Sequence, residues 1–205
     1  MRKRISVLMI LLAGLLTACA SGQREPEELL QQIRGQYLKL TACGGHGEIT
    51  ADYGQRVYAY GFDFRWEKEG ETQLTLTAPE NVAGAVAHIS AGETALEFDG
   101  VMLETGALDS AGLTPIDVIP ALLTYAREGF VSSCAVEGDE EAQTIHILCS
   151  DPEKQPGQGV EADLWFDRET FALVRGEISS DGVTVIQCEI TDFTATVPSD
   201  DKPVE

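Results

Sequence analysis

The sequence predicts an α+β domain built on one large, meandering antiparallel sheet of about ten strands. Three observations lead to this prediction. Short runs with alternating apolar residues are separated by turn residues along most of the chain, a helical stripe comes first, and a second helical pattern interrupts the strands. The leading helix is expected from Pro26 to about Leu40, where Leu30, Ile33 and Tyr37 recur at helical spacing.

The second helix is expected in the middle of the chain, from Thr114 to Glu128. Thr114-Pro115-Ile116-Asp117 suits a helix start, with a capping threonine and a proline at the first helical position. Pro120 is expected to kink or split this helix, because an interior proline removes a backbone hydrogen bond.

The strands are expected on both sides of this insertion. A hairpin over residues 93–104 should close at Asp99-Gly100, a dipeptide suited to a two-residue turn. The other strands are expected at residues 47–53, 55–68, 72–78, 82–90, 130–136, 143–150, 160–167, 171–179 and 183–194.

The strand at 55–68 carries the strongest pattern in the chain. Large aromatic residues occupy alternate positions and therefore share one face: Tyr58, Tyr60, Phe62, Phe64 and Trp66. Five such rings bury roughly 750–1,250 Å² when covered, more than a soluble protein leaves in water. Either helices of the same chain cover this face as core, or part of it forms a groove for an apolar ligand.

The N-terminus has the organisation of a lipoprotein signal peptide. Arg2-Lys3-Arg4 precedes an apolar run of about a dozen residues, which is too short to span a bilayer comfortably. The run ends in Leu16-Thr17-Ala18-Cys19, which resembles the bacterial lipobox. We expect a signal peptide at 1–18, lipidation at Cys19, a tether at 19–25, the folded domain at 26–196 and a disordered acidic tail at 197–205.

The net charge excludes one class of partner. The full chain has 14 basic and 34 acidic residues; without Arg2, Lys3 and Arg4 the balance is 11 minus 34, or −23. A surface this acidic repels nucleic acid and anionic lipid headgroups. The expected location is the cell envelope, with the chain anchored on the outer side of the cytoplasmic membrane, or on an outer membrane if the cell has one.

Four cysteines follow Cys19, and an even number in an exported chain suggests two disulfides. Cys134 and Cys149 flank an acidic turn, so we favour Cys134–Cys149 together with Cys43–Cys188 among the three possible connectivities. Buried free thiols are the alternative. No Cys-x-x-Cys is present and the three histidines are scattered, so no metal site is expected.

Catalytic signatures are missing from the sequence. There is no Gly-x-Ser-x-Gly, no Ser-x-x-Lys and no cysteine set beside a histidine. His46, His88 and His146 lie far apart along the chain. We therefore expect a protein that is not an enzyme and that uses no cofactor.

The order of these elements resembles the LolA-like lipoprotein-carrier and lipoprotein-sorting superfamily. The resemblance rests on the lipobox, the leading helix, the mid-chain helix from Leu113 and the final hairpins, and it covers about residues 26–195. Lipobox-bearing GerS-like germination lipoproteins are more similar still, through Tyr37, Leu38, Leu40 and Cys43 and the late Asp192-Phe193. The chain departs from soluble carriers in its anchor, its acidity and its cysteines.

The resemblance implies a curved half-barrel sheet that wraps the two helices and binds acyl chains on its concave side. One functional hypothesis is a lipid-anchored envelope protein whose aromatic face receives an acyl chain of a lipid or lipoprotein. The alternative, implied by the germination lipoproteins, is an interaction protein with a closed core that docks a cell-wall enzyme such as a cortex amidase.

Overall fold

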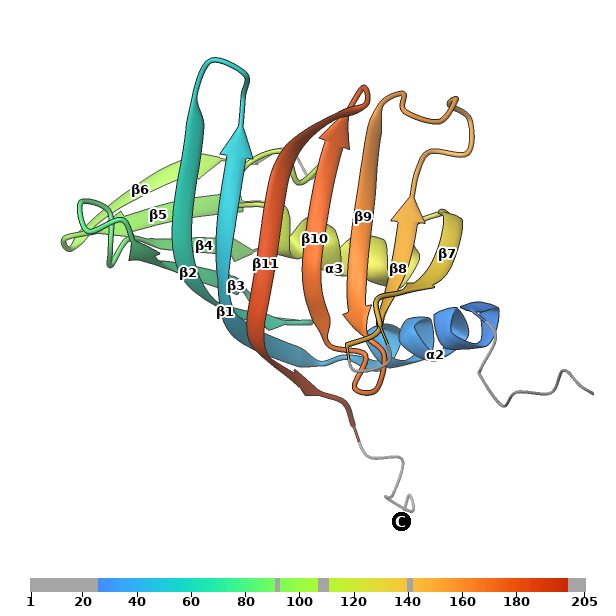
Figure 1. Cartoon of the computed structure of the whole chain (residues 1–205). Helices are drawn as coiled ribbons and strands as arrows, with labels where there is room; N and C mark the ends of the chain where they lie inside the picture. Colours follow the sequence, from blue (N-terminus) through green and yellow to red (C-terminus); the bar gives the residue numbers. More distant parts are fainter. Residues whose placement is uncertain (1–25, 91–92, 107–110, 140–141, 199–205) are drawn as a thin grey trace, which may run out of the picture.

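The structure, a computed structural model, describes residues 26–90, 93–106, 111–139 and 142–198 (Figure 1). It contains two helices, α2 (Pro26–Lys39) and α3 (Val118–Glu128), and one sheet of eleven strands. The expected signal peptide, Cys19 and the tether lie outside the described residues. The strands are β1 (Ala42–Asp52), β2 (Val57–Glu67), β3 (Thr72–Ala78), β4 (Val86–Ser90), β5 (Glu93–Phe98), β6 (Val101–Gly106), β7 (Val131–Glu137), β8 (Thr144–Cys149), β9 (Val160–Asp167), β10 (Leu173–Ser180) and β11 (Val183–Thr196).

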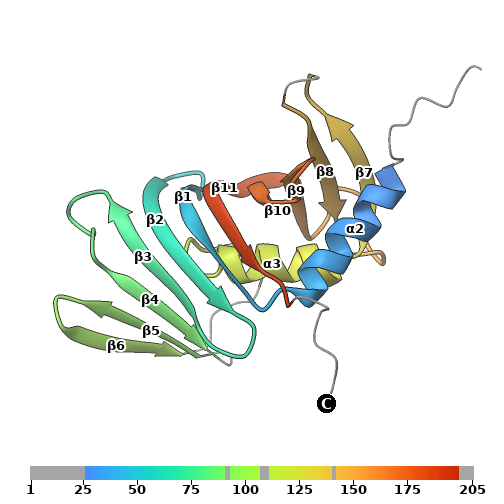
Figure 2. The ribbon, with the colours of Figure 1, turned by 90° about the horizontal axis from the view of Figure 1, so that it is seen from below.

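The sheet consists of two meanders that meet at its centre. The strand order is β6-β5-β4-β3-β2-β1-β11-β10-β9-β8-β7, and all neighbours are antiparallel. The first and last strands pair in the middle, with Ile49 opposite Cys188. The sheet is strongly curved and unclosed (Figures 1 and 2). The predicted fold class, an α+β half-barrel, is confirmed.

Helix α2 forms where the sequence predicts it. Glu27 and Glu28 lie in its first turn and Lys39 in its last, so the charges complement the helix dipole. Leu29, Ile33 and Tyr37 are buried on one side. Within the described part of the chain, no helix is long and apolar enough to cross a membrane.

Helix α3 begins later than expected and is not kinked. Its N-cap is Asp117 rather than Thr114, and the Asp117 carboxylate accepts hydrogen bonds from the Thr114 backbone N–H at 2.9 Å and the Thr114 hydroxyl at 2.7 Å. Pro120 is consequently the third helical residue. The expectation of a kink was wrong, because backbone N–H groups in the first turn have no partner within the helix and a proline there removes no bond.

The helices lie inside the curve, beside the second meander. Helix α2 contacts α3, β7 and β8, and α3 contacts β9. The close approach of α3 to β10 requires Gly176, where a Cβ atom would stand 2.5 Å from Leu122 Cδ1. The strands β3 to β6 extend beyond the two helices (Figure 2). The first meander is therefore covered less than the second.

The described cysteines are free, which differs from the expected disulfides. Cys43 lies opposite Ala195 whereas Cys188 lies opposite Ile49, so the two are six positions apart along the β1–β11 ladder. At about 3.3 Å per residue this separation far exceeds the reach of a disulfide, and the Cys43–Cys188 pairing was wrong. Cys134 lies opposite Ile147 rather than Cys149, so these two thiols are also not directly opposed.

Candidate functional site

The aromatic face of β2 is divided into a covered half and an open half. Phe62, Phe64 and Trp66 are buried, with exposed fractions of 0%, 5% and 8%, whereas Tyr58 and Tyr60 are half-buried. The helices and β11 cover the end with Phe64 and Trp66, and the end with Tyr58 and Tyr60 is open.

The covered half depends on glycines in the neighbouring strand. Gly45 and Gly47 of β1 lie directly opposite Phe64 and Phe62. A Cβ atom at Gly47 would come within 2.7 Å of the Phe62 ring, and one at Gly45 within 3.1 Å of the Phe64 ring. The missing side chains therefore leave space for the two rings to lie over β1.

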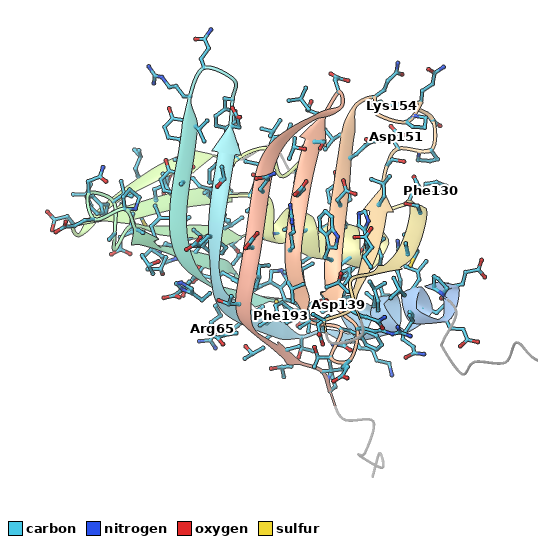
Figure 3. The ribbon with its side chains drawn as sticks, in the orientation of Figure 1. Arg65, Phe130, Asp139, Asp151, Lys154 and Phe193 are labelled. Atoms are coloured by element: carbon cyan, nitrogen blue, oxygen red, sulfur yellow. The ribbon has the colours of Figure 1, made fainter. Side chains whose placement is uncertain are left out.

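Phe193 joins this aromatic cluster to helix α2. Its ring centroid lies 6.4 Å from that of Phe64 and 6.3 Å from that of Tyr37, and Tyr37 contacts Phe166 edge-on at 5.3 Å. Figure 3 marks Phe193 on the lower part of β11. These rings close the lower end of the concave face.

A β-bulge in β11 directs Phe193 inward. Gly44 pairs with Thr194 but His46 pairs with Thr191, so β11 has one extra residue there. Asp192 has a positive φ of 52°, and the inward positions shift from even to odd numbers between Ile190 and Phe193. In the Asp192-Phe193 pair, Asp192 therefore forms the bulge and Phe193 is the aromatic residue that the bulge turns toward the concave face.

The open half of the aromatic face leads into an apolar pocket of about 300 Å³. It lies on the concave side of the first meander, between β2–β5 and the segment that precedes α3. The lining residues are Tyr60, Leu74, Leu76, Val82, Ala85, Val86, Ala87, Leu96, Glu97, Phe98, Pro115 and Ile116. All but Glu97 and the Tyr60 hydroxyl are apolar.

The carboxylate of Glu97 belongs to the opposite face of the sheet. Leu96 pairs with Ala87, so Glu97 and His88, each one residue further along, point to the convex side. There Glu97 approaches His88 Nε2 at 3.5 Å. The pocket thus offers an uncharged, apolar interior.

A tyrosine ladder fixes one wall of the pocket. Tyr60 stacks on Tyr58 with centroids 6.3 Å apart, and Tyr58 contacts Tyr53 at 6.1 Å. The Tyr53 hydroxyl donates a hydrogen bond of 3.0 Å to the Leu113 carbonyl. This bond ties the β1–β2 hairpin to the segment that carries Pro115 and Ile116.

Several pocket residues were missed at the level of sequence. The run from Val82 to Ala87 reads only as a weak strand of small residues, yet Ala85 and Ala87 leave the space that the pocket occupies. Small residues facing large ones across a curved sheet are the signal that could have indicated it.

A second cluster, also missed, lies on the convex face of β7–β10. His146 Nδ1 is 2.8 Å from Glu137 and its Nε2 is 2.6 Å from Asp163. The imidazole stacks on Trp165 at 4.4 Å, and the Arg175 guanidinium lies over the same indole at 4.9 Å. The hydrogen bond to Asp163 raises the pKa of His146, against the opposing effect of burial. The side chains of this cluster come from β7, β8, β9 and β10, so their hydrogen bonds and ring contacts link these four strands.

The described thiols are poor nucleophiles. Burial raises the pKa of Cys43 and of Cys188 to about 12 and that of Cys149 to about 11. Among the described residues, no group of three or more His, Cys, Asp or Glu side chains is arranged to hold a metal ion. The apolar pocket is therefore the candidate site that the geometry supports best.

Comparison with known proteins finds similarity in fold alone. No protein-family model matches the sequence, and no curated protein matches it. Solved structures that match include a LolA superfamily protein from Nitrosomonas europaea, with 10% identity, a TM-score of 0.45, and 87% of this chain and 96% of that chain covered.

Two further matches are lipoprotein structures. The Mycobacterium tuberculosis lipoprotein LppX has 16% identity and a TM-score of 0.46, over 88% of this chain and 99% of its own. A chain of the complex of the CwlD amidase with the GerS lipoprotein from Clostridioides difficile has 12% identity and a TM-score of 0.40, over 84% of this chain and 96% of that chain.

Proposed function

We propose that this protein is a lipid-anchored envelope lipoprotein that binds an acyl chain of a lipid or lipoprotein in the pocket beside Tyr60. The observation that carries the proposal is the pocket itself, which is open on the concave face and apolar throughout its interior. An acyl chain has no polar groups to satisfy, and each methylene transferred from water to such a site contributes about 0.8 kcal/mol.

The dimensions of the pocket favour a single chain. A volume of about 300 Å³ lies at the lower end of the range for small-molecule sites. The polar head of the ligand would remain at the mouth of the pocket. The proposal includes Cys19 as the lipidated residue, so that the domain works close to a membrane that supplies such chains.

The alternative, an interaction protein with a closed core, is supported less well. The rings of Phe62, Phe64 and Trp66 behave as a closed core, but the pocket next to Tyr60 stays open. An open apolar pocket is the feature that a protein with a purely structural core does not need.

The test is uptake of a fluorescent fatty acid by the delipidated, full mature protein, followed by native mass spectrometry of protein purified from its own cells. Ala85→Trp places an indole in the pocket and should reduce uptake at least tenfold. The matched control is Ala59→Trp, on the exposed side of β2, which should bind as the parent does. Absence of both uptake and co-purified lipid would refute the proposal, as would equal uptake by Ala85→Trp.

A further inference from the structure

Strand β6 forms an open edge of the sheet. It pairs with β5 on one side, and in the part of the chain that the structure describes no strand pairs with its other side. The opposite edge strand, β7, is packed by α2, and Cys134 of β7 contacts the Pro26 carbonyl at 3.5 Å. The two edges of the sheet are therefore protected to different degrees.

Three consecutive exposed side chains of β6 are apolar. Val101, Met102 and Leu103 have exposed fractions of 68%, 60% and 62%. Natural edge strands are usually protected by lysine, proline or a bulge. Residues 101–106 contain no lysine or proline, and the register irregularity falls at Thr105, so positions 101 to 104 pair regularly and leave a continuous edge.

The two faces of the hairpin β5–β6 differ in chemistry. Leu103 lies opposite Leu96, and Val101 lies opposite Phe98, so this face continues the apolar wall of the concave side. Met102 lies opposite Glu97, and Glu104 points to the same convex side as Met102. One face of the hairpin is thus apolar and the other acidic.

The part of the chain that contains this edge is strongly acidic. No lysine or arginine occurs between Lys68 and Arg127, a stretch that holds nine acidic residues. Pairing of β6 with a second copy would join two acidic convex faces, each carrying Glu97 and Glu104, into one sheet, and an anionic bilayer would be repelled in the same way. The complementary occupant is a basic one.

We propose that β6 is a docking strand for an extended, basic segment of a partner protein, which adds to the sheet next to residues 101–104. The backbone edge supplies the hydrogen bonds, as in other cases of strand addition. Alternate residues of the partner are apolar, against Val101 and Leu103. The residues between them are lysine or arginine, beside Glu104 on β6 and on the same face as Glu97, one strand further in. The proposal is independent of acyl binding in the pocket.

The probe is a short fluorescent peptide that alternates valine with lysine, added to the full mature protein. We expect saturable binding by anisotropy that weakens as salt is raised, with hydrogen-exchange protection of the amides of residues 101–104. A peptide of the same composition with its lysines in one block, and one that alternates valine with glutamate, should bind at least tenfold more weakly.

Two variants and one control locate the effect. Leu103→Lys should reduce affinity for the valine–lysine peptide at least tenfold, whereas Val183→Lys, at an equally exposed valine in the β10–β11 hairpin, should not change it. Glu97→Lys combined with Glu104→Lys should transfer the preference to the valine–glutamate peptide.

Several results would overturn the proposal. They are binding without protection of β6 amides, equal binding by Leu103→Lys, and a peptide preference that survives the charge reversal. Sedimentation showing a dimer that Leu103→Lys dissociates would assign the edge to a second copy instead. Flotation with neutral vesicles that Leu103→Lys abolishes would assign it to a membrane.

Discussion

The ring of Phe62 lies over Gly47, its direct partner across β1 and β2, so closely that a Cβ atom at Gly47 would stand 2.7 Å from Phe62 Cζ and 2.6 Å from the Glu189 carbonyl oxygen. Neither neighbour can move away easily, because the Phe62 ring is fully buried and the Glu189 oxygen belongs to the backbone of β11. The absence of a side chain at Gly47 therefore allows the Phe62 ring of β2 to lie over β1 at the centre of the sheet.

Replacement of Gly47 by alanine should destabilise the protein. Because the new methyl group must displace a buried ring or a strand, we expect a loss of about 2–3 kcal/mol in the free energy of unfolding, measured with urea. The matched control is Gly35→Ala in α2, where nothing lies within 4 Å of the added Cβ. Alanine there should stabilise the helix by about 0.5–1 kcal/mol. Equal effects at both sites would contradict the prediction.

Replacement of Phe193 should separate helix α2 from the aromatic face. Phe193→Ala removes the ring that contacts both Tyr37 and Phe64, and we expect a cost of about 2–4 kcal/mol in thermal or urea unfolding. Phe130 is a suitable control because 57% of it is exposed, and both residues are labelled in Figure 3. Phe130→Ala should cost less than about 1 kcal/mol; a comparable loss at Phe130 would show that the bridging role is wrong.

The contribution of His146 to stability should depend on pH. Its pKa is raised above the ordinary 6.5, chiefly by the hydrogen bond to Asp163. A raised pKa means that the stabilisation is fully present below about pH 6.5 and is lost as the pH rises through the higher folded value. The pKa of Glu137 is lowered, chiefly by its hydrogen bond from Trp165, so the pair with His146 stays charged in mildly acidic solution.

The measurement compares His146→Gln with the parent in urea at about pH 5.5 and about pH 8.5. We expect the variant to be less stable by about 1 kcal/mol at the lower pH and by less at the higher pH. Asp163→Asn should lower the pKa of His146 in an NMR titration. A difference that grows with pH would contradict the assignment.

The cysteines should react in a definite order. Burial raises the pKa of Cys43 and Cys188 to about 12 and that of Cys149 to about 11, so few of these thiols are ionised near pH 8. Cys134 is half-buried, and its pKa is raised less. In a Cys19→Ser variant, alkylation followed by mass spectrometry should label Cys134 first and the others only on unfolding. Resistance of any pair until a reductant is added would instead indicate a disulfide.

Features formed by residues close together in the chain were predicted well from the sequence, whereas the register between distant strands was predicted poorly. Helix α2 and the turn at Asp99-Gly100, with φ values of 51° and 74°, follow from residues close together in the chain. The Cys43–Cys188 pairing failed because it depends on the register of β1 against β11, strands that lie about as far apart in sequence as the domain allows. A slip in register is not visible in the alternation of either strand alone.

The location of the pocket could not be predicted from the sequence, for a related reason. All five rings of β2 share one face, and nothing in their spacing tells which of them the helices reach. That division depends on the start of α3 at Val118 and on the bulge at Asp192, which sends Phe193 to the lower end of the face. The polar cluster around His146 and Trp165 was missed because it needs three hairpin registers at once.

The pairing of β1 with β11 has a consequence for how the chain acquires its structure. Each meander consists of neighbouring strands joined by short connections, but Ala42 meets Thr196 across nearly the whole domain. Closing so long a loop costs more entropy than forming a hairpin, and long-range pairing slows folding. We therefore expect the two meanders to form early and the pairing of β1 with β11 to form last. The pairing of β1 with β11 is then part of the rate-limiting step, so Ile49→Val should slow folding in stopped-flow kinetics. An effect confined to faster unfolding would place this pairing after the barrier.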